Sequence, residues 1–316
     1  MIKVRVASRA QAAEGIVRLD LVCAEGRDLP SFEAGAHVDL FLGNGLTRQY
    51  SLCNDPADRG RYRIAVLREP TSRGGSAYVH ETLIEGATLD ISPPRNLFAL
   101  DEAAEAHLLF AGGVGVTPIL AMARRLHALG SPFVFHYCAR DRSRAAFLDE
   151  LSTAPFADAV RLSFDAEPET RLDLDTALAK PTPGRRLYVC GPVGFMTHVI
   201  DGAVARGWTP AQIRKEHFAA APVSEGEDRP FELLIASTGQ VVSVAADQSA
   251  AQALEAAGVF VPVSCEQGVC GTCLTRVIDG QPDHRDAFQT DEERAANDQF
   301  TPCCSRARSP RLVLDL

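Results

Sequence analysis

Five cysteines near the end of the chain have the spacing of metal ligands. Cys265, Cys270 and Cys273 form a C-x4-C-x2-C run, and Cys303 and Cys304 follow at a distance. Such a run with one distant fourth cysteine is the spacing of a plant-type [2Fe–2S] cluster. A structural zinc site is the alternative, but zinc modules usually present two C-x2–4-C pairs rather than one run and a lone partner. The spacing leaves Cys303 and Cys304 as rivals for the fourth position.

Small residues separate the three clustered cysteines. Gly268, Gly271 and Thr272 lie between or beside them, and small side chains let backbone N–H groups approach the sulfurs of a cluster. We therefore predict that this loop wraps the cluster and that a separate segment closes it with the fourth cysteine.

Two glycine turns point to a nucleotide site. Gly112-Gly113-Val114-Gly115-Val116-Thr117-Pro118 follows the expected strand 108–111 and precedes an expected helix over 119–129, where a parallel sheet binds nucleotide phosphates. The second turn, Cys190-Gly191-Pro192, ends the expected strand 187–190 and leads into a helix over 195–205. The first turn is not a G-x-G-x-x-G fingerprint, and tight packing between strand and helix is the alternative explanation for its glycines.

A third segment has the residues of a phosphate site. In Arg48-Gln49-Tyr50-Ser51-Leu52 a strand would send Arg48 and Tyr50 to one face and Gln49 and Ser51 to the other. Arg73-Gly74-Gly75-Ser76 precedes an expected helix over 77–83, so Ser76 as N-cap and the helix N-terminus are expected to hold a phosphate. A simple helix cap after a flexible turn is the alternative.

The elements around these motifs form three modules. Short strands at 3–8, 16–23, 37–42, 48–52 and 62–67, separated by turn residues, predict a small antiparallel β-barrel. From about residue 107 strands alternate with helices, which indicates a doubly wound parallel sheet. A small, polar stretch at 219–228 is typical of a linker, and residues 231–237 and 240–244 form an expected hairpin around Thr238-Gly239.

Composition excludes several classes of protein. The 316 residues carry a net charge of −9 with scattered Lys and Arg, which argues against nucleic acid or an anionic membrane as a partner. The N-terminus has no signal-peptide core, and no apolar run is long enough to span a membrane. We therefore expect a cytoplasmic protein whose nine cysteines stay thiols or metal ligands.

The order of the motifs resembles the phthalate dioxygenase reductase family over essentially the whole chain. These motifs are R-x-Y-S, R-G-G-S, G-G-x-G-x-T-P, Y-V-C-G-P and the C-terminal cysteine run. Reductases of vanillate O-demethylase and related Rieske oxygenases share this layout. The resemblance implies a multidomain protein with an FMN-binding antiparallel β-barrel domain over 1–102, an NAD-binding doubly wound α/β domain over 103–225, and a β-grasp (α+β) plant-type [2Fe–2S] ferredoxin domain over 229–316.

The resemblance also implies roles for single residues. The predicted catalytic residues are Ser51 and Cys190. Ser51 is expected to hydrogen-bond near flavin N5, and Cys190 is expected to position the nicotinamide ring without bonding to it. Phe218 is expected over the flavin, with an ordinary core phenylalanine as the alternative. The C-x-S-R pattern favours Cys303 over Cys304, so the predicted metal ligands are Cys265, Cys270, Cys273 and Cys303. The residues expected to bind FMN or NADH are Arg48, Gln49, Tyr50, Ser51, Arg73, Gly74, Gly75, Ser76, Gly113, Gly115, Thr117, Arg140, Cys190, Gly191, Pro192 and Phe218.

The choice of nucleotide depends on residues after the strand 133–138. Arg140, Arg142 and Arg144 lie where they would meet the adenosine ribose or a 2′-phosphate, so NADPH stays an alternative. The resembled family mostly uses NADH, and Asp141 among the arginines favours an unphosphorylated ribose by like-charge repulsion.

These modules together predict an electron-transfer enzyme. NADH delivers two electrons and a [2Fe–2S] centre accepts one, so a flavin must stand between them. The predicted function is the reductase component of a Rieske-type oxygenase, with that terminal oxygenase as partner. The alternatives are a reductase of the ferredoxin type that serves another monooxygenase, and a non-catalytic redox- or metal-sensing module. Glu266, Asp279, Asp283 and Asp286 are expected to steer docking to the partner, with a solvated acidic face as the alternative.

Overall fold

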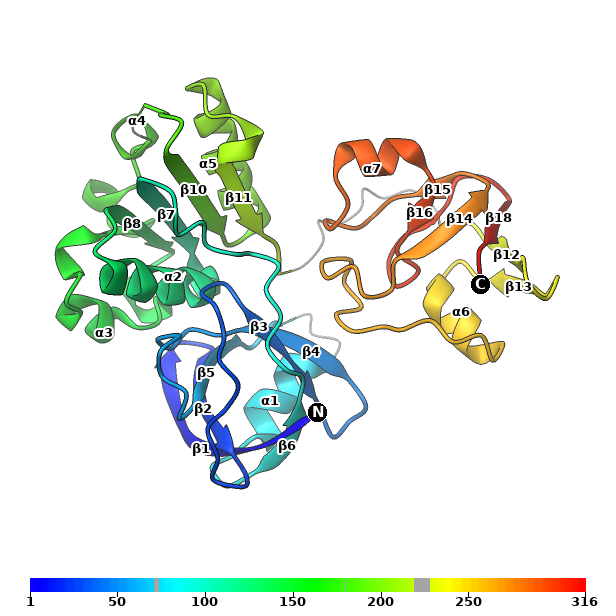
Figure 1. Cartoon of the computed structure of the whole chain (residues 1–316), viewed down its shortest axis with the longest axis horizontal. Helices are drawn as coiled ribbons and strands as arrows, with labels where there is room; N and C mark the ends of the chain where they lie inside the picture. The colour runs from blue at the N-terminus through cyan, green and yellow to red at the C-terminus, as the bar shows by residue number, and fades with distance from the viewer. Residues whose placement is uncertain (71–73, 179, 219–227) are drawn as a thin grey trace. The chain divides into compact units, whose positions relative to one another are not determined.

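The computed structural model describes residues 1–70, 74–178, 180–218 and 228–316. Its contacts divide the chain into two compact units, Met1–Glu216 and His217–Leu316 (Figure 1). The predicted linker at 219–228 lies outside the described residues except for Asp228. The first unit holds two sheets, so the predicted boundary at 102/103 falls within it and stays a prediction. Among the described residues, no helix has the length and apolar character that a membrane span requires.

The N-terminal sheet of the first unit is antiparallel and six-stranded. Its strands lie in the order β4 (Thr47–Ser51), β3 (His37–Phe41), β6 (Thr88–Ile91), β1 (Ile2–Ala13), β2 (Ile16–Cys23) and β5 (Tyr62–Leu67). Alternate residues of these strands face a shared apolar core, for example Val4 and Val6 in β1 and Leu19 and Leu21 in β2. Helix α1 (Gly75–Thr82) contributes Val79 to this core. The predicted antiparallel architecture is confirmed.

The second sheet of the first unit is parallel and five-stranded. Its order is β11 (Ile213–Glu216), β10 (Arg185–Cys190), β7 (Ala106–Gly112), β8 (Phe133–Ala139) and β9 (Val160–Phe164). The chain starts at β7, runs to one side through β8 and β9, and then crosses to β10 and β11. The switch point therefore lies between β7 and β10, and ligands of doubly wound folds bind at such a point, outside the carboxyl ends of the strands.

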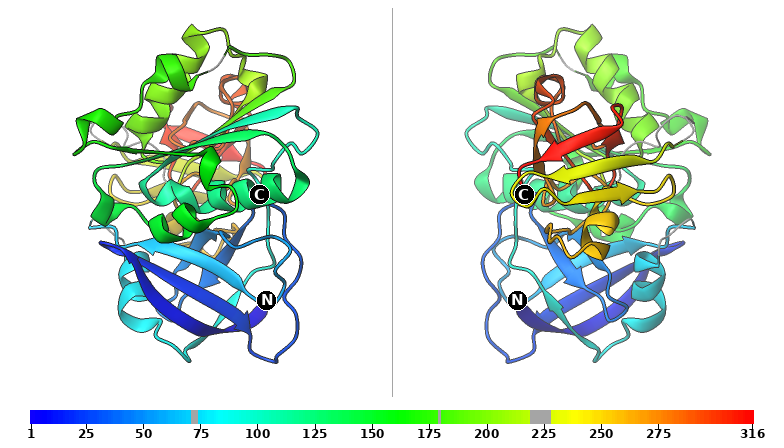
Figure 2. Two further views of the ribbon diagram at one scale, coloured as in Figure 1. Left: turned by 90° about the vertical axis from the view of Figure 1, so that its left-hand side faces the viewer. Right: turned by 90° about the vertical axis from the view of Figure 1, so that its right-hand side faces the viewer.

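Helices cover both faces of the parallel sheet (Figure 2). Residues Leu108 and Phe110 of β7 pack with α5 (Val193–Ala205) and α4 (Leu174–Ala177). The alternating residues Leu109 and Ala111 are fully buried on the opposite face, where α2 (Val116–Leu129) lies. The short helix α3 (Leu148–Thr153) follows β8 in the chain. The predicted α/β architecture is confirmed.

The second unit is a small α+β fold. Its main sheet has the order β13 (Val241–Val244), β12 (Phe231–Ile235), β18 (Arg311–Leu314), β14 (Thr275–Asp279) and β16 (Gln299–Phe300), and a second ladder joins β15 (Pro282–Asp283) to β17 (Arg306–Ala307). β12 pairs with β18 in parallel and with β13 in the predicted antiparallel hairpin. Helix α6 (Ala250–Ala256) packs Leu254 into the core, and α7 (Asp291–Ala296) precedes β16.

Candidate functional site

Strand β4 presents the predicted flavin residues at one edge of the barrel. Tyr50 pairs with Val38 and Arg48 with Leu40, so both side chains lie on the core face, and Tyr50 packs against the barrel core. Burial raises the pKa of Tyr50 to about 12. Gln49 lies on the other face, as predicted, and its Nε2 donates to Asp39 Oδ1 at 3.0 Å. Since Arg95 also donates to Asp39, at 2.7 and 2.6 Å, Gln49 belongs to a polar network of the barrel itself.

Arg48 lies against the N-terminus of α1. A Cβ on Gly75 would stand 2.6 Å from Arg48 Cγ and 2.7 Å from its Nε, so only glycine admits the arginine there. Gly74 before it has φ +93°, a left-handed conformation that glycine adopts freely. A guanidinium beside a helix N-terminus is the chemistry of a phosphate site.

One detail of this predicted loop is wrong. Ser76 lies inside α1, which has Gly74 at its N-cap with no side-chain cap. The Ser76 hydroxyl instead accepts a hydrogen bond from the backbone N–H of Glu69 at 3.1 Å. The first residue of the predicted loop, Arg73, lies outside the described residues.

The two glycine turns of the parallel sheet touch through their backbones. A Cβ on Gly115 would stand 2.3 Å from Cys190 O, and one on Gly191 would stand 2.9 Å from Gly112 Cα. Close packing, the alternative explanation for the glycines, therefore holds at these positions. Pro192 packs there too, because a Cβ on Gly112 would stand 3.0 Å from Pro192 Cδ.

The outer side of the first turn is open. Gly113 has φ +53°, and no heavy atom lies within 4 Å of the place of its Cβ. The buried Thr117 hydroxyl, by contrast, donates to Val114 O at 3.0 Å and so stabilises the turn from within. This turn leads directly into α2, whose N-terminus carries N–H groups able to bind phosphate.

Both predicted catalytic residues lie next to a glutamate that sequence reasoning missed. Cys190 pairs in register with Glu216 at the carboxyl ends of β10 and β11. The Ser51 hydroxyl of β4 donates to Glu216 Oε2 at 3.2 Å. The barrel and the parallel sheet therefore meet at this junction. Strand β11 was not recognised in the sequence, and without it the register that places Glu216 beside Cys190 is not visible.

Cys190 and Glu216 at this junction both have raised pKa values. Cys190 is fully buried, and burial, with the nearby Glu216 acting in the same direction, raises the pKa of its thiol well above the ordinary value. Burial also raises the pKa of Glu216 to about 8, although the hydrogen bond from Ser51 acts in the opposite direction. A thiol held in its protonated form is a poor nucleophile. Cys190 therefore has the properties of a positioning group rather than of a covalent catalyst.

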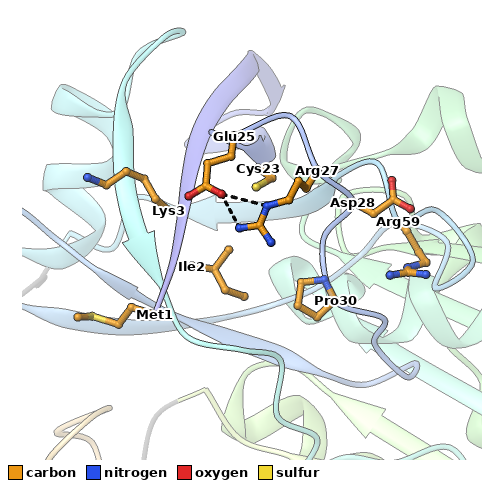
Figure 3. Close-up of a pocket in the computed structure, with 9 residues that line it drawn as sticks. All are labelled: Met1, Ile2, Lys3, Cys23, Glu25, Arg27, Asp28, Pro30 and Arg59. Atoms are coloured by element: carbon orange, nitrogen blue, oxygen red, sulfur yellow. Dashed lines mark hydrogen bonds and ion pairs between the residues drawn. The ribbon is translucent and has the colours of Figure 1, made fainter.

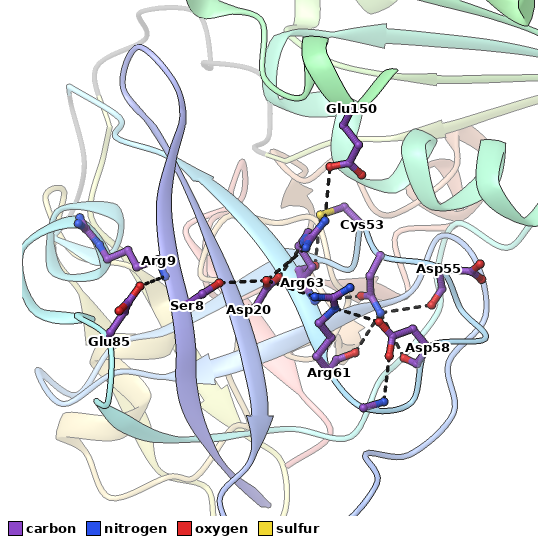
Figure 4. A network of polar contacts seen from close by, with 12 residues as sticks. Ser8, Arg9, Asp20, Cys53, Asp55, Asp58, Arg61, Arg63, Glu85 and Glu150 are labelled. Carbon is purple, nitrogen blue, oxygen red and sulfur yellow. Dashed lines mark hydrogen bonds and ion pairs between the residues drawn. The ribbon is translucent and has the colours of Figure 1, made fainter. Parts of the chain in front are cut away.

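A buried ion-pair network ties the barrel to the helices of the parallel sheet (Figure 4). Asp20 accepts from Ser8 at 3.0 Å and from Arg63 Nε at 2.7 Å. Arg63 Nη1 reaches Glu150 of α3 at 3.4 Å, and Glu150 also pairs with Arg124 of α2. Two barrel strands and two helices are thus joined by charges that lie mostly out of solvent.

A pocket of about 410 Å³ lies elsewhere on the barrel, beside the start of β1 (Figure 3). Its lining includes Lys3, Cys23, Arg27 and Arg59, and the exposed Arg27 pairs with Glu25 within it. None of the described residues predicted to bind a cofactor lines this pocket.

The five C-terminal cysteines come together in the second unit. Cys270 and Cys303 lie beside Cys265, and their thiols hold the pKa of Cys265 well below its ordinary value, which favours the thiolate that metals bind. Cys303 also lies beside Cys273 and Cys304. Within the described residues, no three His, Cys, Asp or Glu side chains are arranged around a single metal ion. A [2Fe–2S] cluster divides four thiolates between two irons.

The loop around these cysteines has the backbone that the sequence predicted. Glu266, Gly268 and Gly271 have φ of +52°, +70° and +67°, so the chain turns sharply between the sulfurs. The N–H of Gln267 donates to Cys265 Sγ at 3.3 Å, and that of Thr272 to Cys270 Sγ at 3.5 Å. N–H groups aimed at the sulfurs fit the negative charge of a cluster.

One expectation about the surroundings of the cysteines is wrong, and it concerns Asp286. Cys303 and Cys304 lie in a turn closed by Cys304 N–H to Thr301 O at 3.1 Å. Cys304 Sγ stands against Gly268, where a Cβ would meet it at 2.5 Å. Asp286 is not part of an acidic surface, because it is 5% exposed and accepts from the N–H of Gln289 at 2.7 Å.

Arg140 and Phe218 are the remaining predicted site residues. Arg140 follows β8 and is exposed. Phe218 belongs to the second unit and is half-buried. Their roles stay predictions.

Comparison with known proteins gives matches over the whole chain. The model of the 2Fe-2S iron-sulfur cluster binding domain matches residues 233–308, and that of the dimethylamine monooxygenase subunit DmmA-like N-terminal domain matches residues 88–213. Vanillate O-demethylase oxidoreductase of Pseudomonas sp. (strain HR199 / DSM 7063) is 55% identical over 100% of both chains. Phthalate dioxygenase reductase of Burkholderia cepacia is 38% identical over 100% of this chain and 97% of its own. The solved structure titled phthalate dioxygenase reductase, described as modular for electron transfer from pyridine nucleotides to [2Fe–2S], has a TM-score of 0.82 at 38% identity, covering 100% of this chain and 98% of that one.

Proposed function

Because the chain belongs to the phthalate dioxygenase reductase family, we propose that its flavin is FMN and that its electron acceptor is a Rieske-type oxygenase. The chain is an NADH-dependent oxidoreductase, the reductase component of an oxygenase system. It moves electrons from NADH through a flavin and a [2Fe–2S] cluster. A bound flavin supplies the conversion between the two-electron donor and the one-electron acceptor.

The observation that carries the proposed site is the bond between Ser51 and Glu216 beside Cys190. It joins the barrel strand proposed to bind the flavin to the sheet edge proposed to bind the nicotinamide. Ser51 holds one end of this contact and Cys190 fills the space beside it as a neutral thiol. Burial raises the pKa of Glu216, so this junction carries little negative charge at neutral pH. Hydride transfer needs close positioning and no general acid or base.

Substitution of the junction residues tests this site. Cys190→Ala and Ser51→Ala are expected to retain the flavin and to slow its reduction by NADH in anaerobic stopped-flow experiments. Cys23→Ala, which removes a buried thiol on the barrel strand β2, is the matched control and is expected to leave the rate unchanged. A rate for Cys190→Ala equal to that of wild type would remove Cys190 from the site.

The choice of FMN rests on the Arg48 cradle. FMN ends in a phosphate monoester, and the guanidinium of Arg48 beside the N-terminus of α1 suits a terminal dianion. Residues Gly74 and Gly75 provide the room for it. Chromatography of the flavin extracted from purified protein tests the proposal, because FAD in the extract would overturn it. Arg48→Gln is expected to lower the flavin content, and Arg61→Gln, an exposed arginine of the barrel, is not.

The metal ligands we propose are Cys265, Cys270, Cys273 and Cys303. The donor set fits a [2Fe–2S] cluster, since the thiols lie beside one another and backbone N–H groups point at two of the sulfurs. A cytoplasmic location, where thiols stay reduced, fits a chain in which all nine cysteines are free. We also retain 1–102, 103–225 and 229–316 as the proposed domain ranges.

We propose a Rieske-type partner because this chain transfers electrons and a second protein must activate oxygen. The chain moves electrons, and its sequence contains no C-x-H…C-x-x-H pattern for a Rieske centre of its own, so oxygen activation is assigned to a separate oxygenase. The test mixes NADH-reduced protein with a purified Rieske oxygenase under anaerobic conditions. Oxidation of the reductase with matching reduction of the Rieske centre supports the proposal, and transfer only to a haem monooxygenase contradicts it.

A further inference from the structure

Two loops meet at the edge of the parallel sheet where the adenosine end of a dinucleotide lies. β8 and β9 are adjacent and parallel, and β8 pairs with β7 so that Cys138 lies beside Gly112. The segments after β8 and β9 therefore leave the same edge as the glycine turn. In dinucleotide folds, an acidic residue near the second strand binds the ribose 2′-hydroxyl of NAD, or an arginine there receives the 2′-phosphate of NADP.

The segment after β8 brings arginines to this edge, and one of them is already engaged by a carboxylate. Arg142 Nε and Nη2 donate to Glu167 Oε1 and Oε2 at 2.7 and 2.9 Å. Its guanidinium also lies over the ring of Phe164, at 4.6 Å from the centroid. A bidentate contact of this kind uses the two parallel N–H groups with which arginine grips a phosphate.

Glu167 is held in place by its own turn. Its N–H donates to Phe164 O at 3.1 Å, and its carbonyl accepts from Thr170 Oγ1 at 2.9 Å. The same hydroxyl accepts from the N–H of Phe164 at 2.9 Å. The backbone that carries the carboxylate is therefore fixed by its own turn, and the carboxylate itself is held by Arg142.

Arg144, the next arginine, also faces carboxylates. It stands 3.4 Å from Glu14 and 3.6 Å from Asp141. Asp141 accepts from Ser143 Oγ at 2.7 Å and from the N–H of Arg144 at 3.1 Å, so it too has a fixed position. An incoming 2′-phosphate would meet these acidic groups before it could recruit either guanidinium.

We propose that Glu167 is the residue that makes this site select NADH over NADPH, because it occupies the guanidinium fork of Arg142 that would otherwise bind a 2′-phosphate. The inference rests on the nucleotide site proposed above. It extends that proposal by assigning the discrimination to one ion pair, Glu167–Arg142, and not to Asp141 alone. The adenosine ribose of NADH carries no charge at its 2′ position, so the Glu167–Arg142 pair does not affect the binding of NADH.

Glu167→Gln tests the assignment, because it removes the charge and keeps the size of the side chain. The ratio of the rates of flavin reduction by NADPH and NADH, measured anaerobically by stopped flow, is expected to rise about tenfold, while the NADH rate changes less than about twofold. The gain should shrink at high salt, since Arg142 is largely exposed and its charge is screened. Glu102→Gln, which breaks a similar bidentate pair with Arg125 elsewhere in the first unit, is the matched control.

Binding of a nucleotide fragment gives a readout that does not depend on turnover. Calorimetry is expected to show tighter binding of 2′,5′-ADP to Glu167→Gln than to wild type, with 5′-AMP unchanged. The double variant Glu167→Gln/Arg142→Gln should lose the gain, because the freed guanidinium is gone.

The outcomes separate this inference from the proposed function. An unchanged NADPH/NADH ratio in Glu167→Gln, or a gain that survives loss of Arg142, would overturn the role of Glu167 and leave the reductase intact. The role of Glu167 would also be overturned if Glu167→Gln bound 5′-AMP more tightly than wild type by the same factor as 2′,5′-ADP. If neither nucleotide reduces the flavin of the wild-type protein, the proposed function fails instead.

Discussion

The contact between the two glycine turns makes Gly115→Ala the most informative single substitution. Gly115 has φ −60°, which alanine adopts without strain, so the whole effect of the change is steric. The added Cβ would stand 2.3 Å from Cys190 O and 2.7 Å from the N of Gly191. A carbon–oxygen contact normally requires about 3.3 Å. One turn must therefore move by about 1 Å relative to the other.

That displacement acts directly on the geometry of the reaction. The turn of Gly115 is proposed to hold the nucleotide phosphates, and Cys190 to position the nicotinamide, so the two move apart. A misplacement of about 1 Å costs roughly 100-fold in rate. We expect flavin reduction by NADH to slow about 100-fold in anaerobic stopped flow, with flavin and iron contents unchanged and with reduction of both centres by dithionite intact.

A matched glycine controls for the loss of stability. Gly130 ends the same helix α2 with φ +67°, and no heavy atom lies within 4 Å of the place that its Cβ would take. Gly130→Ala is expected to lower the free energy of unfolding by about 1 kcal/mol without slowing flavin reduction. A Gly115→Ala protein that binds NADH and is reduced within about twofold of the wild-type rate would refute the steric argument.

Three further results are expected. Cys303→Ser should lose or distort the cluster absorption while NADH still reduces the flavin, and Cys304→Ser should keep the cluster; the reverse pattern would show that Cys304 is the ligand. Because the folded-state pKa of Glu216 is raised to about 8, the native state holds a proton that the unfolded chain loses above about pH 4.5, so stability falls as pH rises from about 5 to 8. Glu216→Gln should flatten this fall in melting temperature, and a fall as steep as in wild type would count against the buried carboxyl. Asp20→Asn should lower the free energy of unfolding by about 2–3 kcal/mol in urea denaturation, since it leaves the mostly buried Arg63 with a weaker partner; an unchanged midpoint would contradict this.

Local patterns allowed most of the architecture to be predicted. Strand alternation placed Arg48 and Tyr50 on one face and Gln49 and Ser51 on the other, and the hairpin around Gly239 formed as expected. The glycine turn after β7 was found because a strand, a turn and a helix follow each other directly in the chain. Such features depend on neighbours in sequence, and they need no tertiary pairing to be recognised.

The errors and omissions depend on contacts between distant segments. Glu216 became visible only through the parallel register of β11 with β10, which no local periodicity reports. The ion pair of Arg63 with Glu150 joins the barrel strand β5 to helix α3. In both cases tertiary geometry decided what the local sequence leaves open. Ser76 resembled an N-cap by type and spacing, but the positive φ of Gly74 moved the start of the helix back to Gly75.

An anaerobic titration with NADH, followed by absorbance and electron-spin resonance on the same sample, is the most direct test of the electron path. The purified protein is expected to contain flavin and a [2Fe–2S] cluster, and NADH is expected to bleach both. The signal of a one-electron-reduced cluster should appear as NADH is added. A protein whose flavin is reduced by NADH without any cluster signal, or one that contains zinc in place of iron, would contradict the proposed path of electrons.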